Sequence, residues 1–225
     1  MPITGIDVSS HNGPIDWPTA AASGISFAYA KTTDGITFID PSFKTNWAGI
    51  VAAGLFVGGY HFFEPNDAPT AQADNYLADI SSVNGGTPVL GPGCLAPALD
   101  VETSKTFTPA QIGAAVQTWL NVVAAATGRT PIVYTGTPFW NSSVFAGIPT
   151  VSSPLWLAQY PNPPVPAAPH SLPNPWSSHL IWQWSESATV PGVTGHVDAD
   201  LFNGSLADLQ AFAGIATPIV ATPGS

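Results

Sequence analysis

The stretch that decides the fold is Ala98-Leu99-Asp100-Val101-Glu102, which continues a short apolar run that begins at Leu95. An apolar run of this length, broken only by Pro97, is typical of a buried strand. Residues i and i+2 of a strand share one face, so Asp100 and Glu102 are expected roughly 6–7 Å apart along the backbone. Burial of two neighbouring carboxylates is costly unless they share a proton or bind a partner. We therefore interpret the pair as a chemical site at the end of a core strand.

Short apolar strands and helical segments alternate along the chain on both sides of this stretch, which is the pattern of parallel βα units. Strands are expected at residues 4–8, 25–31, 55–63, 95–102, 132–135, 155–160, 179–185 and 197–202. Helices are expected at residues 16–23, 41–53, 69–80, 108–128 and 205–212, so few follow the fifth strand. The sequence predicts an α/β fold, a TIM-like barrel of eight strands with an incomplete helical ring.

The domain organisation follows from the same pattern. The barrel is expected to occupy residues 1–214, and the Thr- and Pro-containing segment 215–225 is typical of a tail or the start of a linker. No apolar run reaches the roughly 18 residues that cross a bilayer, so membrane insertion is not expected. The first residues lack the basic and then apolar pattern of a signal peptide, so we expect either that the protein is not exported by that route or that a leader has been cut away.

Charged residues make up only 8% of the 225 residues, against about 25% in an average protein. The net charge is −10, and the only basic residues are Lys31, Lys44, Lys105 and Arg129. Such a chain lacks the positive surface that holds a phosphate backbone, so nucleic acid is not an expected partner. The single cysteine, Cys94, excludes a disulfide framework and a thiolate metal cluster.

Acidic residues are expected to converge at one end of the barrel. In TIM-like barrels the active site lies at the carboxyl ends of the strands. Asp7 is expected at the carboxyl end of the first strand, Asp100 and Glu102 at that of the fourth, and Asp198 at that of the eighth. The first and eighth strands are neighbours when the barrel closes, and the fourth lies across the mouth from them. We expect these four acids to form the catalytic site, with Asp200 on the same strand face as Asp198.

Other side chains at strand ends are candidates for substrate binding. Aromatic rings suit the apolar faces of sugars, although aromatic residues also dominate protein cores. Lys31 ends the second strand and either binds substrate or neutralises the acids, and Gln183 either contacts substrate or satisfies backbone groups. The expected substrate-binding residues are Lys31, Tyr60, Tyr134, Trp156, Gln183 and Trp184.

The motifs resemble those of the glycoside hydrolase family 25 muramidases, the Chalaropsis-type lysozymes, in order from residue 5 to about residue 212. The matching segments are Gly5-Ile6-Asp7-Val8-Ser9 with His11 and Asn12, Ala30-Lys31-Thr32-Thr33-Asp34-Gly35, Gly59-Tyr60-His61-Phe62, Ala98-Leu99-Asp100-Val101-Glu102, Leu155-Trp156-Leu157-Ala158-Gln159-Tyr160, Trp182-Gln183-Trp184-Ser185, and Val197-Asp198-Ala199-Asp200-Leu201-Phe202. The chain departs from the family pattern at three positions that lie beside the main acids. Asp34 stands where Glu is frequent, Asp200 where Asn is frequent, and Trp184 where Tyr is more common. The family motif places its acid first, at Asp198, so the resemblance implies a structural role for Asp200.

The resemblance implies a flattened barrel and cleavage of the β-1,4 bond between N-acetylmuramic acid and N-acetylglucosamine in peptidoglycan, without a cofactor. It makes Glu102 the general acid/base, with Asp100 assisting and Asp7 and Asp198 as supporting acids. The implied partner is the glycan strand of bacterial peptidoglycan, and a monomer is expected. The implied place of action is outside the cell or at the bacterial wall, including the case of a phage-encoded enzyme released without a signal peptide.

Two other classes stay open on sequence grounds. The first is a peptidoglycan-binding module with the same barrel and weak or no catalysis. The second is a metal-dependent hydrolase that uses the same acids together with His11, His61 or His196, although no closely spaced histidine pair supports it.

Overall fold

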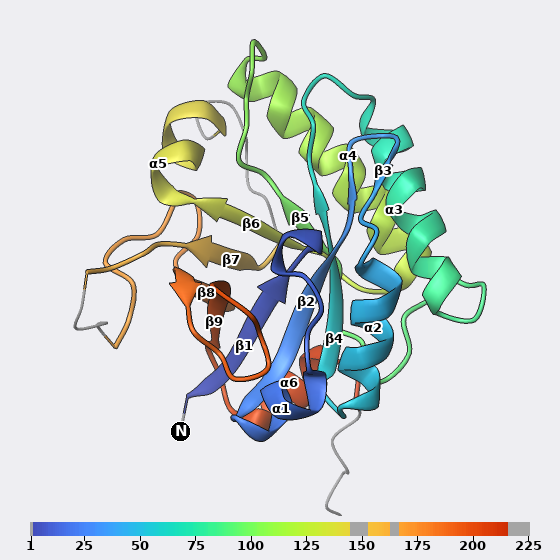
Figure 1. Ribbon diagram of the computed structural model, residues 1–225. Helices are drawn as coiled ribbons and strands as arrows, with labels where there is room; N and C mark the ends of the chain where they lie inside the picture. The colour runs from blue at the N-terminus through green and yellow to red at the C-terminus, as the bar shows by residue number, and fades with distance from the viewer. Residues whose placement is uncertain (1, 145–152, 163–166, 216–225) are drawn as a thin grey trace, which may run out of the picture.

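The computed structural model describes residues 2–144, 153–162 and 167–215, and in this part of the chain one sheet of nine strands forms the centre of the molecule (Figure 1). The strands run in the order β1-β9-β8-β7-β6-β5-β4-β2-β3, and a further β1–β2 pairing closes eight of them into a barrel. Their bounds are Ile3–Val8 (β1), Ile25–Asp34 (β2), Phe38–Ile39 (β3), Phe56–Phe62 (β4), Ala98–Asp100 (β5), Ile132–Gly136 (β6), Leu155–Ala158 (β7), Ile181–Ala188 (β8) and Val197–Phe202 (β9). The predicted eight-stranded α/β barrel is confirmed.

Helices cover only part of the barrel. Figure 1 shows α2, α3 and α4 side by side against one flank, whereas β7, β8 and β9 have no long helix beside them. The helices are Trp17–Ala22 (α1), Phe43–Ala52 (α2), Pro69–Val83 (α3), Pro109–Thr127 (α4), Thr137–Phe139 (α5) and Leu206–Phe212 (α6), with short turns at Ser10–Asn12 (η1) and Trp140–Val144 (η2). On the uncovered flank, Leu172 and Trp176 from the loop before β8 pack on Leu155, Leu157 and Trp182. The helical ring is incomplete, as predicted.

Local sequence signals explain where the helices start. Asp16 caps α1 by accepting a hydrogen bond from the backbone N–H of Thr19. Thr108 and Gln111 form a capping box at the start of α4, and Gly128 ends that helix in the left-handed conformation. None of the helices in the described part of the chain is both long and apolar enough to cross a membrane.

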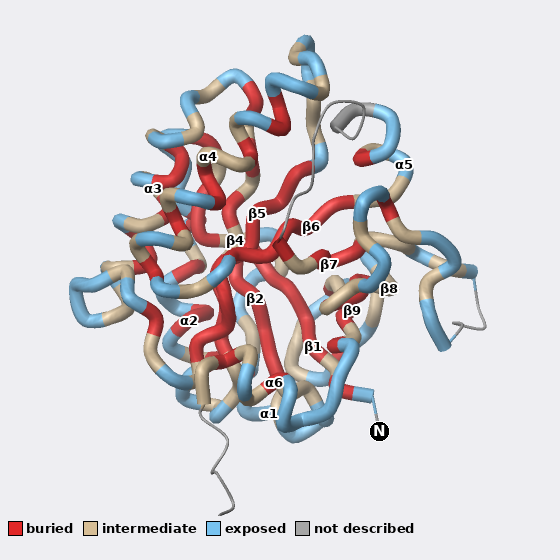
Figure 2. Tube along the Cα trace, turned by 180° about the vertical axis from the view of Figure 1, so that it is seen from behind, coloured by how far each residue is buried: buried red, intermediate tan, exposed pale blue. Residues whose placement is uncertain are grey.

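The strands separate two packed layers, and Figure 2 shows most of their length buried. Inside the barrel, Phe27, Tyr29 and Trp156 are almost fully buried and pack in one hydrophobic cluster. Glycine at position 5 is required by this packing, because a Cβ there would lie only 2.3 Å from the ring of Phe27. Above this aromatic cluster, Asp7, Asp100 and Gln183 line a cavity at one end of the barrel.

The structure corrects the prediction in three places. The last strand, β9, runs antiparallel to both β1 and β8, so Asp198 reaches the mouth from the beginning of its strand and not from the end. The turn after β2 adds the two-residue strand β3, and helical turns at α5 and η2 follow β6, where none was expected. The predicted tail at 215–225 lies, apart from Ile215, outside the described residues.

Candidate active site

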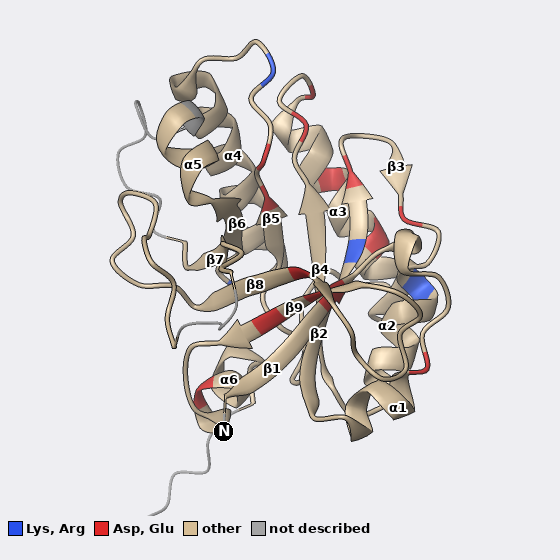
Figure 3. Cartoon of the chain, turned by 60° about the vertical axis from the view of Figure 1, so that its left-hand side comes forward, with Lys and Arg blue, Asp and Glu red and all other residues tan. Residues whose placement is uncertain are grey.

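A cavity of about 260 Å³ opens at the mouth of the barrel. Nine of the ten residues that the sequence predicts for the site line this cavity. Its lining consists of Asp7, Ser9, His11, Lys31, Tyr60, Phe62, Asp100, Glu102, Tyr134, Trp156, Gln183 and Asp198. Figure 3 shows acidic positions on β5 and β9 within a chain that carries few basic residues.

Asp100 and Glu102 come from β5 and the segment directly after it. Asp100 is 8% exposed, and its Oδ1 atom has no hydrogen-bond partner in the described part of the chain. Burial, followed by the charge of Glu102, raises the pKa of Asp100 well above its ordinary value. Glu102 is exposed at the rim, and partial desolvation together with the charges of Asp198 and Glu186 raises its pKa less strongly. The pair can therefore hold a proton above the pH at which free carboxyl groups lose theirs.

Asp7 and Asp198 face each other across the β1–β9 ladder, in which they are direct partners. Asp7 is 6% exposed, whereas Asp198 is half-buried. Burial, and then the nearby carboxyl groups of Asp200 and Asp198, raise the pKa of Asp7 well above its ordinary value. The pKa of Asp198 is also raised by burial, although its hydrogen bond with Asp7 opposes the rise. These two carboxyl groups thus form a second pair in which a proton is held more tightly than on a free carboxyl group.

Gln183 connects Asp7 to two tyrosine hydroxyl groups. Its Nε2 atom donates to Oδ2 of Asp7 at 2.6 Å, and its Oε1 atom accepts from Tyr134 at 2.7 Å and from Tyr160 at 2.6 Å. The side chain is 2% exposed, and both of its polar atoms are occupied. The two expected roles of Gln183 are contact with substrate and satisfaction of backbone groups, whereas these contacts are with the side chains of an acid and two tyrosines.

Trp156 reaches below the cavity to the deepest acid of the mouth. Its Nε1 atom donates to Oδ1 of Asp200 at 2.8 Å, and Asp200 is fully buried. The ring of Trp156 also packs against Tyr29 and Tyr134, with centroids 4.7 Å and 5.1 Å apart. Trp156 therefore forms the floor of the cavity and fixes Asp200.

Lys31 is the only cation among the residues that line the cavity. Its Nζ atom forms an ion pair with Asp34 at 3.0 Å and lies 5.0 Å from the ring centroid of Phe62 and 5.6 Å from that of Phe38. The β2–β4 register shifts between Lys31 and Thr33, so the strand bulges at this point. The positive charge lowers the pKa of Asp100 and Glu102 and partly offsets the effect of burial.

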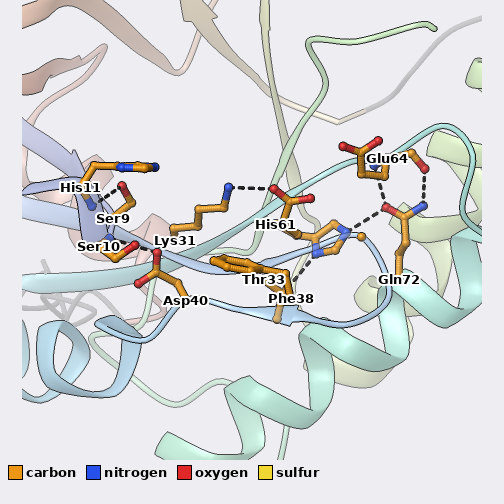
Figure 4. A network of polar contacts seen from close by, with 12 residues as sticks. Ser9, Ser10, His11, Lys31, Thr33, Phe38, Asp40, His61, Glu64 and Gln72 are labelled. Carbon is orange, nitrogen blue, oxygen red and sulfur yellow. Dashed lines mark hydrogen bonds and ion pairs between the residues drawn. The ribbon is translucent and has the colours of Figure 1, made fainter.

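Buried polar contacts hold the loops at the rim, as Figure 4 shows. His61 lies between Thr33 and Gln72, at 2.7 Å and 3.1 Å, and burial lowers its pKa to about 4. The Asp40 carboxylate accepts from the backbone N–H of Ser10 and so fixes the turn that carries His11 to the cavity. His61 therefore supports the fold.

Three lining residues were not predicted as site residues, namely Ser9, His11 and Phe62. Each lies two positions, or one short turn, from a predicted residue, so extension of the two-residue strand period past Asp7 and Tyr60 identifies Ser9 and Phe62. Tyr160 was also missed, and its hydroxyl joins the site through Gln183.

Trp184 does not lie in the cavity. It is half-buried and packs against the outer cluster that contains Trp182 and Leu201. Strand alternation explains this position, because the neighbouring residue Gln183 points into the barrel. We therefore leave Trp184 out of the candidate site.

The acids of the mouth are not arranged as metal ligands. Among the residues that the structure describes, no group of three or more His, Cys, Asp or Glu side chains has the geometry to hold a metal ion. The arrangement suits acid–base chemistry by carboxyl groups. Glu102 is accessible at the rim, and Asp7 and Asp100 are buried behind it.

Comparison with known proteins agrees with this geometry. The sequence profile described as "Glycosyl hydrolases family 25" matches residues 6–193. Lysozyme M1 of Streptomyces globisporus is 34% identical over 94% of this chain and 73% of its own length, and the N,O-diacetylmuramidase of Chalaropsis sp. is 31% identical over 94% and 99%. The crystal structure of the lysozyme from Streptomyces coelicolor superposes with a TM-score of 0.82 at 32% identity and covers 96% of this chain and 99% of that one. The chain therefore belongs to glycosyl hydrolases family 25 and is a glycoside hydrolase.

Proposed function

We propose that the protein hydrolyses peptidoglycan at the β-1,4 bond between N-acetylmuramic acid and N-acetylglucosamine. The relatives named lysozyme and N,O-diacetylmuramidase support this choice of substrate. The place of action is then the bacterial wall. The observation that carries the proposal is the pair at the end of β5, in which Glu102 lies accessible at the rim and Asp100 lies buried beside it.

In the proposed reaction Glu102 first acts as a general acid. Its proton passes to the oxygen that links the two sugars, the bond from this oxygen to C1 of the muramic acid unit breaks, and the glucosamine unit leaves with a free 4-hydroxyl group. The raised pKa of Glu102 supports this role, because the group must be protonated before each turnover.

Positive charge develops at C1 of the muramic acid unit during this step, and Asp100 assists there. The proposal holds for both routes that follow, participation of the substrate's own N-acetyl group or direct attack by a carboxylate. In either case a water molecule finally attacks C1 and transfers a proton to Glu102, which restores the acid. Asp7 and Asp198, which are direct partners in the β1–β9 ladder, act as supporting acids in the same cavity.

The substitution Glu102→Gln tests the role of the proton donor. It keeps the shape of the side chain and removes the transferable proton, so release of reducing ends from purified peptidoglycan should fall by at least about 10²-fold. Glu64→Gln is the matched control, because Glu64 pairs with Lys105 and does not line the cavity. Equal activity of the Glu102→Gln variant and the wild type would refute the assignment.

The binding-module alternative predicts a different result. It expects wall binding without release of reducing ends by the wild type at any pH. No feature of the cavity favours it, because binding alone does not require a rim carboxyl group with a raised pKa.

A further inference from the structure

Asp200 is a fully buried carboxyl group that the proposed reaction does not use. It lies on β9 below the cavity, and its Oδ1 atom accepts a hydrogen bond from Nε1 of Trp156 at 2.8 Å. Its Oδ2 atom receives no hydrogen bond from any donor in the described part of the chain. A buried carboxylate oxygen without a donor is costly, so its protonation state needs an explanation.

The group that Asp200 meets is another carboxyl group. In the β1–β9 ladder Asp7 is the direct partner of Asp198, and Asp200 lies two residues further along β9 on the same face, opposite Gly5. Two carboxylates can approach in this way only if a proton lies between them. Each of the two carboxyl groups has one neutral donor, Gln183 for Asp7 at 2.6 Å and Trp156 for Asp200 at 2.8 Å. One proton shared between the two groups therefore accounts for their approach.

We propose that Asp200 is a positioning residue that shares one proton with Asp7 at neutral pH. The shared proton and the amide group of Gln183 then hold the Asp7 carboxyl group in a fixed orientation toward the cavity. This positioning role rests on the proposed function, whereas the shared proton is a property of the fold and can be measured without activity.

The surroundings of Asp200 agree with a proton shared between Asp200 and Asp7. The titratable groups that face it are Asp7 on β1, Asp198 on β9 and the hydroxyl of Tyr29 on β2, and none of the described groups that act on it is cationic. Burial and the charge of Asp198 raise the pKa of Asp200, while the hydrogen bonds of Trp156 and Asp7 oppose the rise.

The substitution Asp200→Asn gives a sharp test, because the amide reproduces both contacts: its oxygen accepts from Trp156 and its NH₂ group donates to Asp7. In the unfolded chain an aspartate loses its proton near pH 4, so the wild type takes up one proton when it folds above this pH. Its stability must then fall as the pH rises toward the folded-state pKa, and the variant lacks this loss.

The measurement is urea unfolding of both proteins between pH 5 and pH 7. The ratio of the wild-type to the variant unfolding constant should rise about tenfold per pH unit, the value for one proton. Asp208→Asn is the control, since Asp208 is an exposed capping carboxylate on α6 whose pKa is lowered, and its ratio should stay constant over this range. A constant ratio for Asp200→Asn would overturn the proton assignment, whatever the enzyme cleaves.

Activity tests the positioning part. Asp200→Asn should keep the wild-type rate on peptidoglycan within about threefold, whereas Asp200→Ala, which cannot donate to Asp7, should lose at least tenfold in kcat while circular dichroism shows that it is folded. Equal losses in both variants, or none in either, would overturn the positioning role. Lack of hydrolysis by the wild type would overturn it together with the proposed function and would leave the unfolding result standing.

Discussion

Gln183 offers the most quantitative test of how the site is held. The substitution Gln183→Met keeps the size of the side chain and removes both of its polar atoms. Asp7 then loses its amide donor, and Tyr134 and Tyr160 lose their shared acceptor. A hydrogen bond to a charged group contributes about 1.5–3 kcal/mol and a neutral one about 0.5–1.5 kcal/mol.

The burial of each partner of Gln183 decides how much hydrogen-bond free energy the substitution removes. Asp7 and Tyr134 are 6% and 7% exposed and cannot turn fully to water, whereas Tyr160 is 44% exposed and can. We therefore expect the free energy of unfolding to fall by about 3–4 kcal/mol, nearly all of it from the first two groups. Because Asp7 also loses its fixed orientation, kcat should fall at least tenfold.

Urea denaturation followed by tryptophan fluorescence measures the first quantity, and reducing-end release measures the second. Gln117→Met is the control, since the side chain of Gln117 on α4 donates a solvent-exposed hydrogen bond to Asn121, and loss of this bond should change stability by less than about 0.5 kcal/mol. A Gln183→Met variant within 1 kcal/mol of the wild type would refute the reasoning.

Three further predictions follow from the same structure. Glu186 raises the pKa of Glu102, so Glu186→Gln should lower this pKa and move the alkaline limb of kcat/KM against pH to lower pH; a shift to higher pH would contradict this. Gly5→Ala should cost at least about 1–3 kcal/mol in the free energy of unfolding, because its Cβ would lie 2.3 Å from Phe27, and a loss below 0.5 kcal/mol in urea denaturation would contradict the packing. Dialysis against EDTA should leave the rate of reducing-end release unchanged, and a loss that added divalent cations restore would refute catalysis by carboxyl groups alone.

The barrel could be predicted because its signals are local. Each strand is a short apolar run, and helices such as α4 begin and end at recognisable caps, here Thr108 and Gly128. The direction of β9 could not be predicted, because a strand carries the same residue pattern in either direction. Asp198 was predicted at the mouth from the carboxyl end of its strand. It does lie there, because the antiparallel β9 begins at that end, where Asp198 pairs directly with Asp7.

The same limits apply to the site. Strand ends and the two-residue period correctly predicted nine of the residues that line the cavity. They did not show that Gln183 faces the cavity while Trp184 faces the opposite side of β8. The network around Gln183 depends on contacts between β1, β6 and β8, and these distances are set by barrel closure and not by local sequence. The state of Asp200 likewise depends on which carboxyl groups the fold brings beside it.

The central claim is that carboxyl groups from distant strands form one site for cleavage of a sugar linkage. Mass spectrometry of peptidoglycan digested with the wild-type protein tests it most directly. The account predicts fragments whose new reducing ends are N-acetylmuramic acid. New reducing ends on N-acetylglucosamine, or intact glycan strands after digestion, would contradict it.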